Sequence, residues 1–256
     1  MAVTFDATLQ VGMRELLAAF KAVVPHAEPT KNGDEVSPNS RVRIVADKDE
    51  VHLLATCTIT SAMASVGIVK GGDSRLERFA PDDGPLIVDV APWAIRKLVQ
   101  QFKAKKAGAD AEPQWGELFI GPSDDGLDIV RLTDRTALFA GMRSEMPQIE
   151  LASDFPDVVK AVSKALEAAA GDMKPLVVKS GPLGLFQHAG LAYGEPLQYE
   201  PTGSGESRGF LVICGEKFIG TISSGHNDDD SLKRRGSQRR KHMERLGLAT
   251  PLASVG

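Results

Sequence analysis

Several residue types that catalyse reactions or bind metals occur in this sequence, but not at the spacing that such sites require. No two histidines have the spacing of an HExxH zinc motif, and the sequence has no GxSxG turn, no Walker A loop and no CxxC pair. The histidines are His26, His52, His188, His226 and His242. Asp124 and Asp125 lie in a PSDDG turn, where aspartate is favoured because its side chain bonds to nearby backbone. The sequence therefore predicts a protein that is not an enzyme and that has no metal site and no cofactor.

The cysteines and the composition indicate a cytoplasmic protein. Cys57 and Cys214 are far apart and lie in strand-like runs, which favours two buried reduced thiols over a disulfide. Hydrophobic residues make up 42% of the 256 residues, and the formal net charge is −4. Because the chain as a whole is acidic, a nucleic-acid role requires a locally basic face. No secretory signal and no apolar run long enough for a bilayer is present, so we expect no membrane partner.

Lysines and arginines lie on the polar faces of three predicted helices. The helices are expected at about 11–24, 92–106 and 155–171. The basic residues on these faces or at the helix ends are Arg14, Lys21, Arg96, Lys97, Lys103, Lys105, Lys106, Lys160 and Lys164. For any single residue, a solvated helix face is the more ordinary explanation, and basic residues near a helix C-terminus also favour the helix dipole.

Each of these helices also carries an apolar stripe that predicts its buried face. In the first helix the stripe is Met13, Leu16, Leu17, Phe20 and Val24. In the second it is Trp93, Ile95, Leu98, Val99 and Phe102. In the third it is Val158, Val162, Ala165, Leu166 and Ala169.

A short repeat indicates how the chain is organised. PLIVDVAPW at 85–93 and PLVVKSGPL at 175–183 share four identical positions. Each copy reads as a β-strand followed by a small residue and a proline that begin a helix, and each helix is followed by strands. The second helix of this kind is expected at about 182–193. The pattern indicates a repeated strand–helix–strands unit, although βαβ pieces with proline are common enough for chance to explain it.

Strands and loops are expected between these helices. Apolar runs predict strands at 2–9, 41–46, 51–61, 63–70 and 136–142, and a hairpin across the PSDDG turn. Residues 143–156 are expected to connect two domains. Residues 225–256 carry three acids and then a basic run, and are expected to be a disordered or partly helical charged tail.

Four segments resemble the bacterial-type DNA polymerase sliding clamp, the β subunit of the replicative polymerase. They are TFDATLQVGMRELLAAFKAVVP (4–25), RVRIVADKDEVHLLATCTITSAMASV (41–66), PLIVDVAPWAIRKLVQQF (85–102) and GELFIGPSDDGLDIVRL (116–132). FPDV at 155–158 and the closing GFLVICGEKFIGTIS at 209–223 are also similar to that family. The family has three domains and usually ends in a Met-Pro-Arg type segment beside its peptide pocket. This chain has room for fewer domains and reads GTISSG there, so we name no pocket residues.

The resemblance implies an α+β sliding-clamp fold of repeated β-α-β-β-β half-domains. Residues 1–147 would form one clamp-like domain and 148–224 a second, shorter one, followed by the charged tail at 225–256. It further implies a homo-oligomeric ring, a dimer or trimer, that encircles double-stranded DNA with its helices lining the hole. The DNA-binding residues would then be the basic residues of these helices, Arg14, Lys21, Arg96, Lys97, Lys103, Lys105, Lys106, Lys160 and Lys164. A DNA polymerase and a clamp loader would be its partners. Two alternatives remain: a DNA-binding accessory protein that uses the basic tail without a ring, and a structural or assembly protein.

Overall fold

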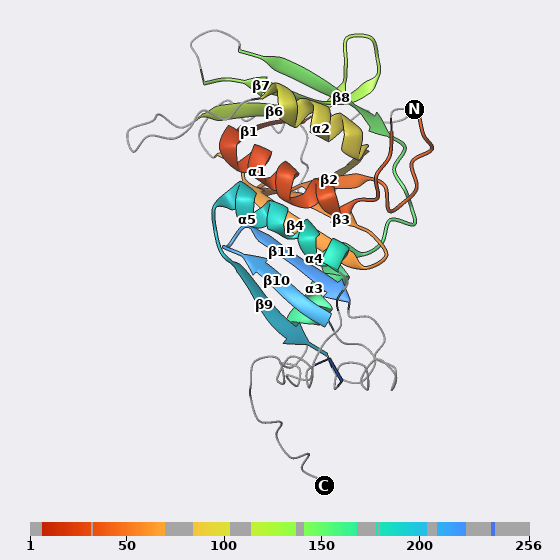
Figure 1. The fold of residues 1–256 in the computed structure, drawn as a ribbon. Helices are drawn as coiled ribbons and strands as arrows, with labels where there is room; N and C mark the ends of the chain where they lie inside the picture. Colours follow the sequence, from red (N-terminus) through yellow and green to blue (C-terminus); the bar gives the residue numbers. More distant parts are fainter. Residues whose placement is uncertain are drawn as a thin grey trace.

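The computed structural model describes residues 7–31, 33–69, 84–102, 114–136, 141–167, 178, 180–203, 209–223 and 237–238. Three successive units form within these ranges (Figure 1). The first half-domain consists of β1 (Ala7–Gly12), α1 (Met13–Val23), a 3₁₀ turn η1 (Val24–His26), β2 (Val42–Ala46), β3 (Glu50–Thr56) and β4 (Thr60–Gly67). The second half-domain consists of β5 (Leu86–Val90), α2 (Pro92–Gln101), β6 (Trp115–Pro122), β7 (Asp128–Asp134) and β8 (Arg143–Ile149).

A helix, α3 (Val158–Glu167), lies between the second half-domain and the last unit. The third unit then consists of α4 (Ser180–Leu185), α5 (Gln187–Tyr193), β9 (Leu197–Thr202), β10 (Gly209–Cys214) and β11 (Phe218–Ser223). No helix in these described ranges is both long enough and apolar enough to cross a membrane.

The first two half-domains exchange their leading strands. β1 pairs with β6 of the second half-domain, and β5 pairs with β2 of the first. The remaining strands of each half-domain form antiparallel meanders, so that the sheet order is β1-β6-β7-β8-β5-β2-β3-β4-β11-β10-β9. β8 and β5 share only two residue pairs, and a single bridge joins Val11 to Ile68 at the opposite corner. The two half-domains are thus interlocked into one domain, and the third unit is joined to it through the pairing of β4 with β11.

The main core lies between the sheets and the helices α1, α2 and α5. The predicted stripe of α1 is buried, and Leu16 and Phe20 are fully enclosed. Ile95, Leu98 and Phe102 of the α2 stripe are buried as predicted, whereas Trp93 and Val99 are partly exposed. These helices form because apolar residues recur at helical spacing, and Pro92 at the first position of α2 loses no hydrogen bond that the helix needs.

Several predicted boundaries are wrong. The strand expected at 51–61 ends at Thr56, and a turn at 57–59 separates it from β4, which begins at Thr60. β8 lies at 143–149, inside the expected connector, and its sequence RSEMPQI gave no strand signal because only Met146 is buried. α2 ends at Gln101, since Phe102 has an extended backbone and turns its side chain into the core. The helix expected at 182–193 is divided into α4 and α5 by a turn at Phe186, whose ring is completely buried. The charged tail, apart from residues 237–238, and the ends of several predicted elements lie outside the described residues.

The helix α3 covers the face of the sheet opposite to α1. Leu53 packs in the main core, whereas its neighbour Leu54 packs against Val158 and Val162 of α3. Successive side chains of a strand point to opposite faces, so α1 and α3 lie on opposite sides of this sheet. In Figure 1 α3 lies behind β9–β11, while α1 and α5 lie in front. Leu166, predicted to be inward, is 55% exposed.

A buried ion-pair network fixes the segment that leads to α3. Asp89 of β5 is fully buried and accepts hydrogen bonds from Arg43 at 2.8 and 3.0 Å and from Arg41 at 3.2 Å. The backbone N–H of Ala152 also donates to this carboxylate, at 3.0 Å. The Arg43 guanidinium stacks on the Phe155 ring, with its central carbon 4.2 Å from the ring centre. Both arginines thereby connect β2 to the chain after β8.

Candidate nucleic-acid interface

The helix α1 presents two of the predicted basic residues on its exposed face. Arg14 in its first turn and Lys21 in its last turn are both exposed, as is Glu15. Lys21 also lies where the helix dipole favours a positive charge, so part of its role is structural. The buried face of α1 fixes the helix against the sheet and thereby holds these side chains on the outward side.

The helix α2 adds two more basic residues on the same side of the domain. Arg96 and Lys97 are exposed, and no acidic residue occurs in this helix. α2 contacts α1, and α1 in turn contacts α5, so the three helices form a row in front of the sheets (Figure 1). α4 and α5 contain no lysine, arginine, aspartate or glutamate. α1 and α2 therefore expose four basic side chains and only one carboxylate, although the net charge of the whole chain is −4.

The structure does not bring all the predicted residues together. Lys160 and Lys164 are exposed, but they belong to α3 on the opposite face of the sheet. Their grouping with the α1 and α2 residues is therefore wrong, because an apolar stripe does not reveal which face of a sheet a helix covers. Lys103, Lys105 and Lys106 lie outside the described residues. The basic row defined by the described residues consists of Arg14, Lys21, Arg96 and Lys97.

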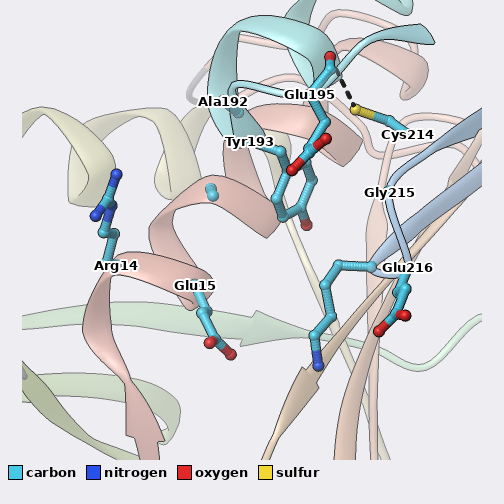
Figure 2. Close-up of a pocket in the computed structure, with 10 residues that line it drawn as sticks. Arg14, Glu15, Ala192, Tyr193, Glu195, Cys214, Gly215 and Glu216 are labelled. Atoms are coloured by element: carbon cyan, nitrogen blue, oxygen red, sulfur yellow. Dashed lines mark hydrogen bonds between the residues drawn. The ribbon is translucent and has the colours of Figure 1, made fainter.

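A cavity of about 610 Å³ opens where the third unit meets α1 (Figure 2). It lies between the start of α1, the end of α5 and the turn that joins β10 to β11. Charged side chains of both signs line it: Arg14, Glu15, Glu195, Glu216 and Lys217. Sequence reasoning missed this cavity because its residues are brought together only by the pairing of β4 with β11.

Tyr193 and Cys214 form the less polar part of this cavity. Burial raises the pKa of the Tyr193 hydroxyl, and the nearby Cys214 and Glu15 raise it further. This hydroxyl is buried, and no described residue forms a hydrogen bond with it. The Cys214 thiol donates to the backbone carbonyl of Glu195 at 3.6 Å, and burial raises its pKa as well. Both groups are therefore held in their neutral forms, which offers neither a nucleophile nor a general base. Among the described residues no group of three His, Cys, Asp or Glu could hold a metal ion.

Comparison with solved structures identifies the fold. The chain superposes on the DNA polymerase III β subunit of Thermotoga maritima with a TM-score of 0.56 at 12% identity, covering 89% of this chain and 67% of that one. The DNA polymerase sliding clamp of Caulobacter crescentus gives a TM-score of 0.51 at 12% identity, with 90% and 68% covered. That of Bacillus subtilis gives 0.51 at 12% identity, with 86% and 64% covered.

The similarity is one of structure. No protein-family model and no curated protein matches the sequence. The chain spans about two thirds of the length of these clamps. It has the α+β fold of bacterial DNA polymerase sliding clamps, at a level of sequence identity where only the fold is shared.

Proposed function

We propose that this chain is a non-enzymatic, cytoplasmic processivity factor. Several copies would form a ring around duplex DNA and tether a DNA polymerase to it, after a clamp loader has placed the ring. The row of basic side chains on α1 and α2 is the observation that supports this proposal most directly. In a clamp fold these helices form one face of the domain, and a basic face of that kind can neutralise phosphates of any sequence.

The distribution of charge supports a DNA-facing side in particular. Arg14, Lys21, Arg96 and Lys97 lie on a helical row with a single exposed carboxylate, Glu15. Three arginines on or next to β7 and β8 are paired with carboxylates. Arg131 and Arg143 bind Glu145 at 2.8 and 2.6 Å, and Arg135 binds Glu117 at 2.8 Å. These arginines are thus largely neutralised, which favours the helical side for the attraction of DNA.

Retention on circular DNA tests the proposal. A closed ring stays on a nicked circular plasmid through a high-salt wash and slides off once the plasmid is linearised. An ordinary basic surface loses both DNAs as salt rises, because binding releases counterions. We expect the chain, supplied with its cognate loader and ATP, to co-elute with circles and not with linear DNA in gel filtration. Equal retention on both, abolished by salt, would contradict the proposal.

Charge reversal tests the basic row with a matched control. Arg96→Glu with Lys97→Glu should lower the amount retained on circles by about tenfold or more, since two attractive contacts become repulsive. Lys160→Glu with Lys164→Glu makes the same change in net charge on the opposite face of the sheet and should leave retention nearly unchanged. If the α3 pair has the larger effect, the DNA-facing side has been assigned incorrectly.

A further inference from the structure

The strand β9 ends the sheet and leaves its outer side open. It pairs with β10 through six residue pairs, and no described strand pairs with its other side. An open edge of this length carries unpaired backbone N–H and C=O groups, which bind another strand readily.

The first domain shows what covers such an edge in this fold. β6, β7 and β8 form a meander after α2, and β9, β10 and β11 form the same meander after α5. β6 is covered along six residue pairs by β1, the leading strand of the neighbouring half-domain. By the same plan, β5 covers β2. The occupant expected for the β9 edge is therefore the leading strand of another half-domain.

The chain does not supply that half-domain between its second and third units. The first half-domain extends from 7 to 67, whereas only residues 150–179 lie between β8 and α4, and these include α3. The leading strands β1 and β5 are already paired with β6 and β2. Both leading strands of the first domain are therefore unavailable to β9.

The sequence itself contains a third leading-strand motif. PLIV at 85–88 forms the beginning of β5, and PLVV at 175–178 is its repeat at the start of the third unit. Lys174 and Lys179 flank this motif without an acidic residue, while β9 carries Glu200 and no basic residue. The charges of the motif and the edge are complementary, which favours a second copy of this chain as the occupant.

Two large apolar side chains of the third unit are exposed. Leu191 on α5 is 83% exposed, and Tyr199 on β9 is 40% exposed. In the first domain α1 and α2, the helices of the two half-domains, pack against each other, whereas α5 packs against α1 of the first domain and α4 of its own unit. A second copy that completes the third unit would place its own α5 beside this one, as α2 lies beside α1.

We propose that two copies of the chain pair through their third units, with the 175–178 segment of each copy adding to the β9 edge of the other. The two units then form one complete, two-fold symmetric clamp domain between two first domains. This pairing rests on the strand plan alone and does not depend on DNA binding, so it and the proposed function can fail separately.

The backbone of β9 indicates which residue to change. Pro201 lacks an N–H, and a proline in an edge strand directs its nitrogen to the open side. Alternate residues of a strand direct their backbone groups to the same side, so the N–H of Tyr199 also points to the open edge. Tyr199→Pro should therefore block strand addition while leaving the pairing with β10 intact. Tyr199→Ala removes the ring but keeps the N–H, and is the matched control.

Sedimentation velocity of the full chain tests the pairing. The experiment uses Glu145→Pro as background, because this change blocks the other incompletely paired strand edge, the side of β8 that meets β5 through only two residue pairs. We expect a species of twice the 27.3 kDa chain mass. Adding Tyr199→Pro should raise the dimer dissociation constant at least about 100-fold, whereas adding Tyr199→Ala should raise it no more than about tenfold. The proposal would be overturned if the background variant remained monomeric at about 100 µM, near the upper concentration limit of the measurement. It would also be overturned if the dimer survived Tyr199→Pro.

A side-chain variant tests the pairing independently, in case the proline variant has a folding defect. Leu191→Glu places a charge where α5 would meet the second copy and should weaken the dimer at least about tenfold. Leu127→Glu changes a residue that is 67% exposed in the turn between β6 and β7, and should leave the dimer unchanged. Equal effects of the two substitutions would also overturn the proposal. Unchanged thermal unfolding of each variant shows that the loss is one of association.

Discussion

At the scale of the residue, His26 is the group most sensitive to acid. It is completely buried, its Nδ1 lies 3.1 Å from the Thr60 hydroxyl, and its Nε2 has no hydrogen-bond partner in the part of the chain that the structure describes. The ring packs edge-on against Phe186 of the third unit, with the ring centres 4.5 Å apart. Burial, together with a smaller contribution from the nearby His188, lowers the pKa of His26 to about 3. Protonation would place a positive charge in this apolar contact, so the folded state requires neutral His26.

This shift predicts an acid-sensitive fold. The unfolded chain binds a proton at His26 below its ordinary pKa of 6.5, but the folded chain does so only near 3. The free energy of unfolding should therefore fall as pH decreases from 6.5 to 3, by up to about 1.4 kcal/mol per pH unit from this residue. Urea unfolding at several pH values measures the slope. His26→Leu should reduce the slope by nearly one proton, and an unchanged slope would show that other groups control it.

At the scale of the element, apolar spacing predicted which segments form helices, but it did not predict which face of the sheet each helix covers. The stripe of α1 from Met13 to Phe20 could be read from the sequence because packing against the sheet requires that spacing. The face that α3 covers could not, because it depends on the segment after β8, which the buried Asp89 holds through Ala152. Strand β8 was missed for a related reason: an edge strand with one buried side chain, Met146, has no alternating pattern. The basic row was therefore predictable only in part.

The position of α3 predicts that it holds the third unit to the first domain. α3 contacts β3 and β4 of the first half-domain and β10 and β11 of the third unit, and so spans their joint. Val158→Ala with Val162→Ala removes the two buried contacts and should lower the free energy of unfolding by about 2–4 kcal/mol. Hydrogen exchange should speed up mainly in β4 and β11. Val159→Ala with Leu166→Ala, at exposed positions of the same helix, should change neither quantity. Equal effects of the two pairs would mean that α3 does not hold this joint.

At the scale of the whole molecule, the proposed ring would close at β8, whose outer side is paired with β5 through only two residue pairs. β8 has the same place in its meander as β11, and the outer side of β11 is paired with β4 at the joint to the first domain. The backbone C=O of Met142 accepts a hydrogen bond from Asp134 on β7, at 2.8 Å. Backbone groups alternate in direction along a strand, so Arg143 and Glu145 direct theirs to the open side. Pro147, which has no N–H, fits the same alternation.

Ring closure through β8 can be separated from the pairing at β9. Glu145→Pro removes an outward N–H from β8 and should reduce retention on circular DNA to the level seen on linear DNA, while the pair formed through β9 persists in sedimentation. The substitution also removes the ion pairs of Glu145 with Arg131 and Arg143, surface contacts that contribute about 1 kcal/mol or less each. Glu145→Ala removes the same two ion pairs but keeps the backbone donor, and should therefore retain circles like the unmodified chain. If Glu145→Pro retains circles as well, the ring closes elsewhere than at β8; if both variants fail, the side chain rather than the strand edge is what closes it.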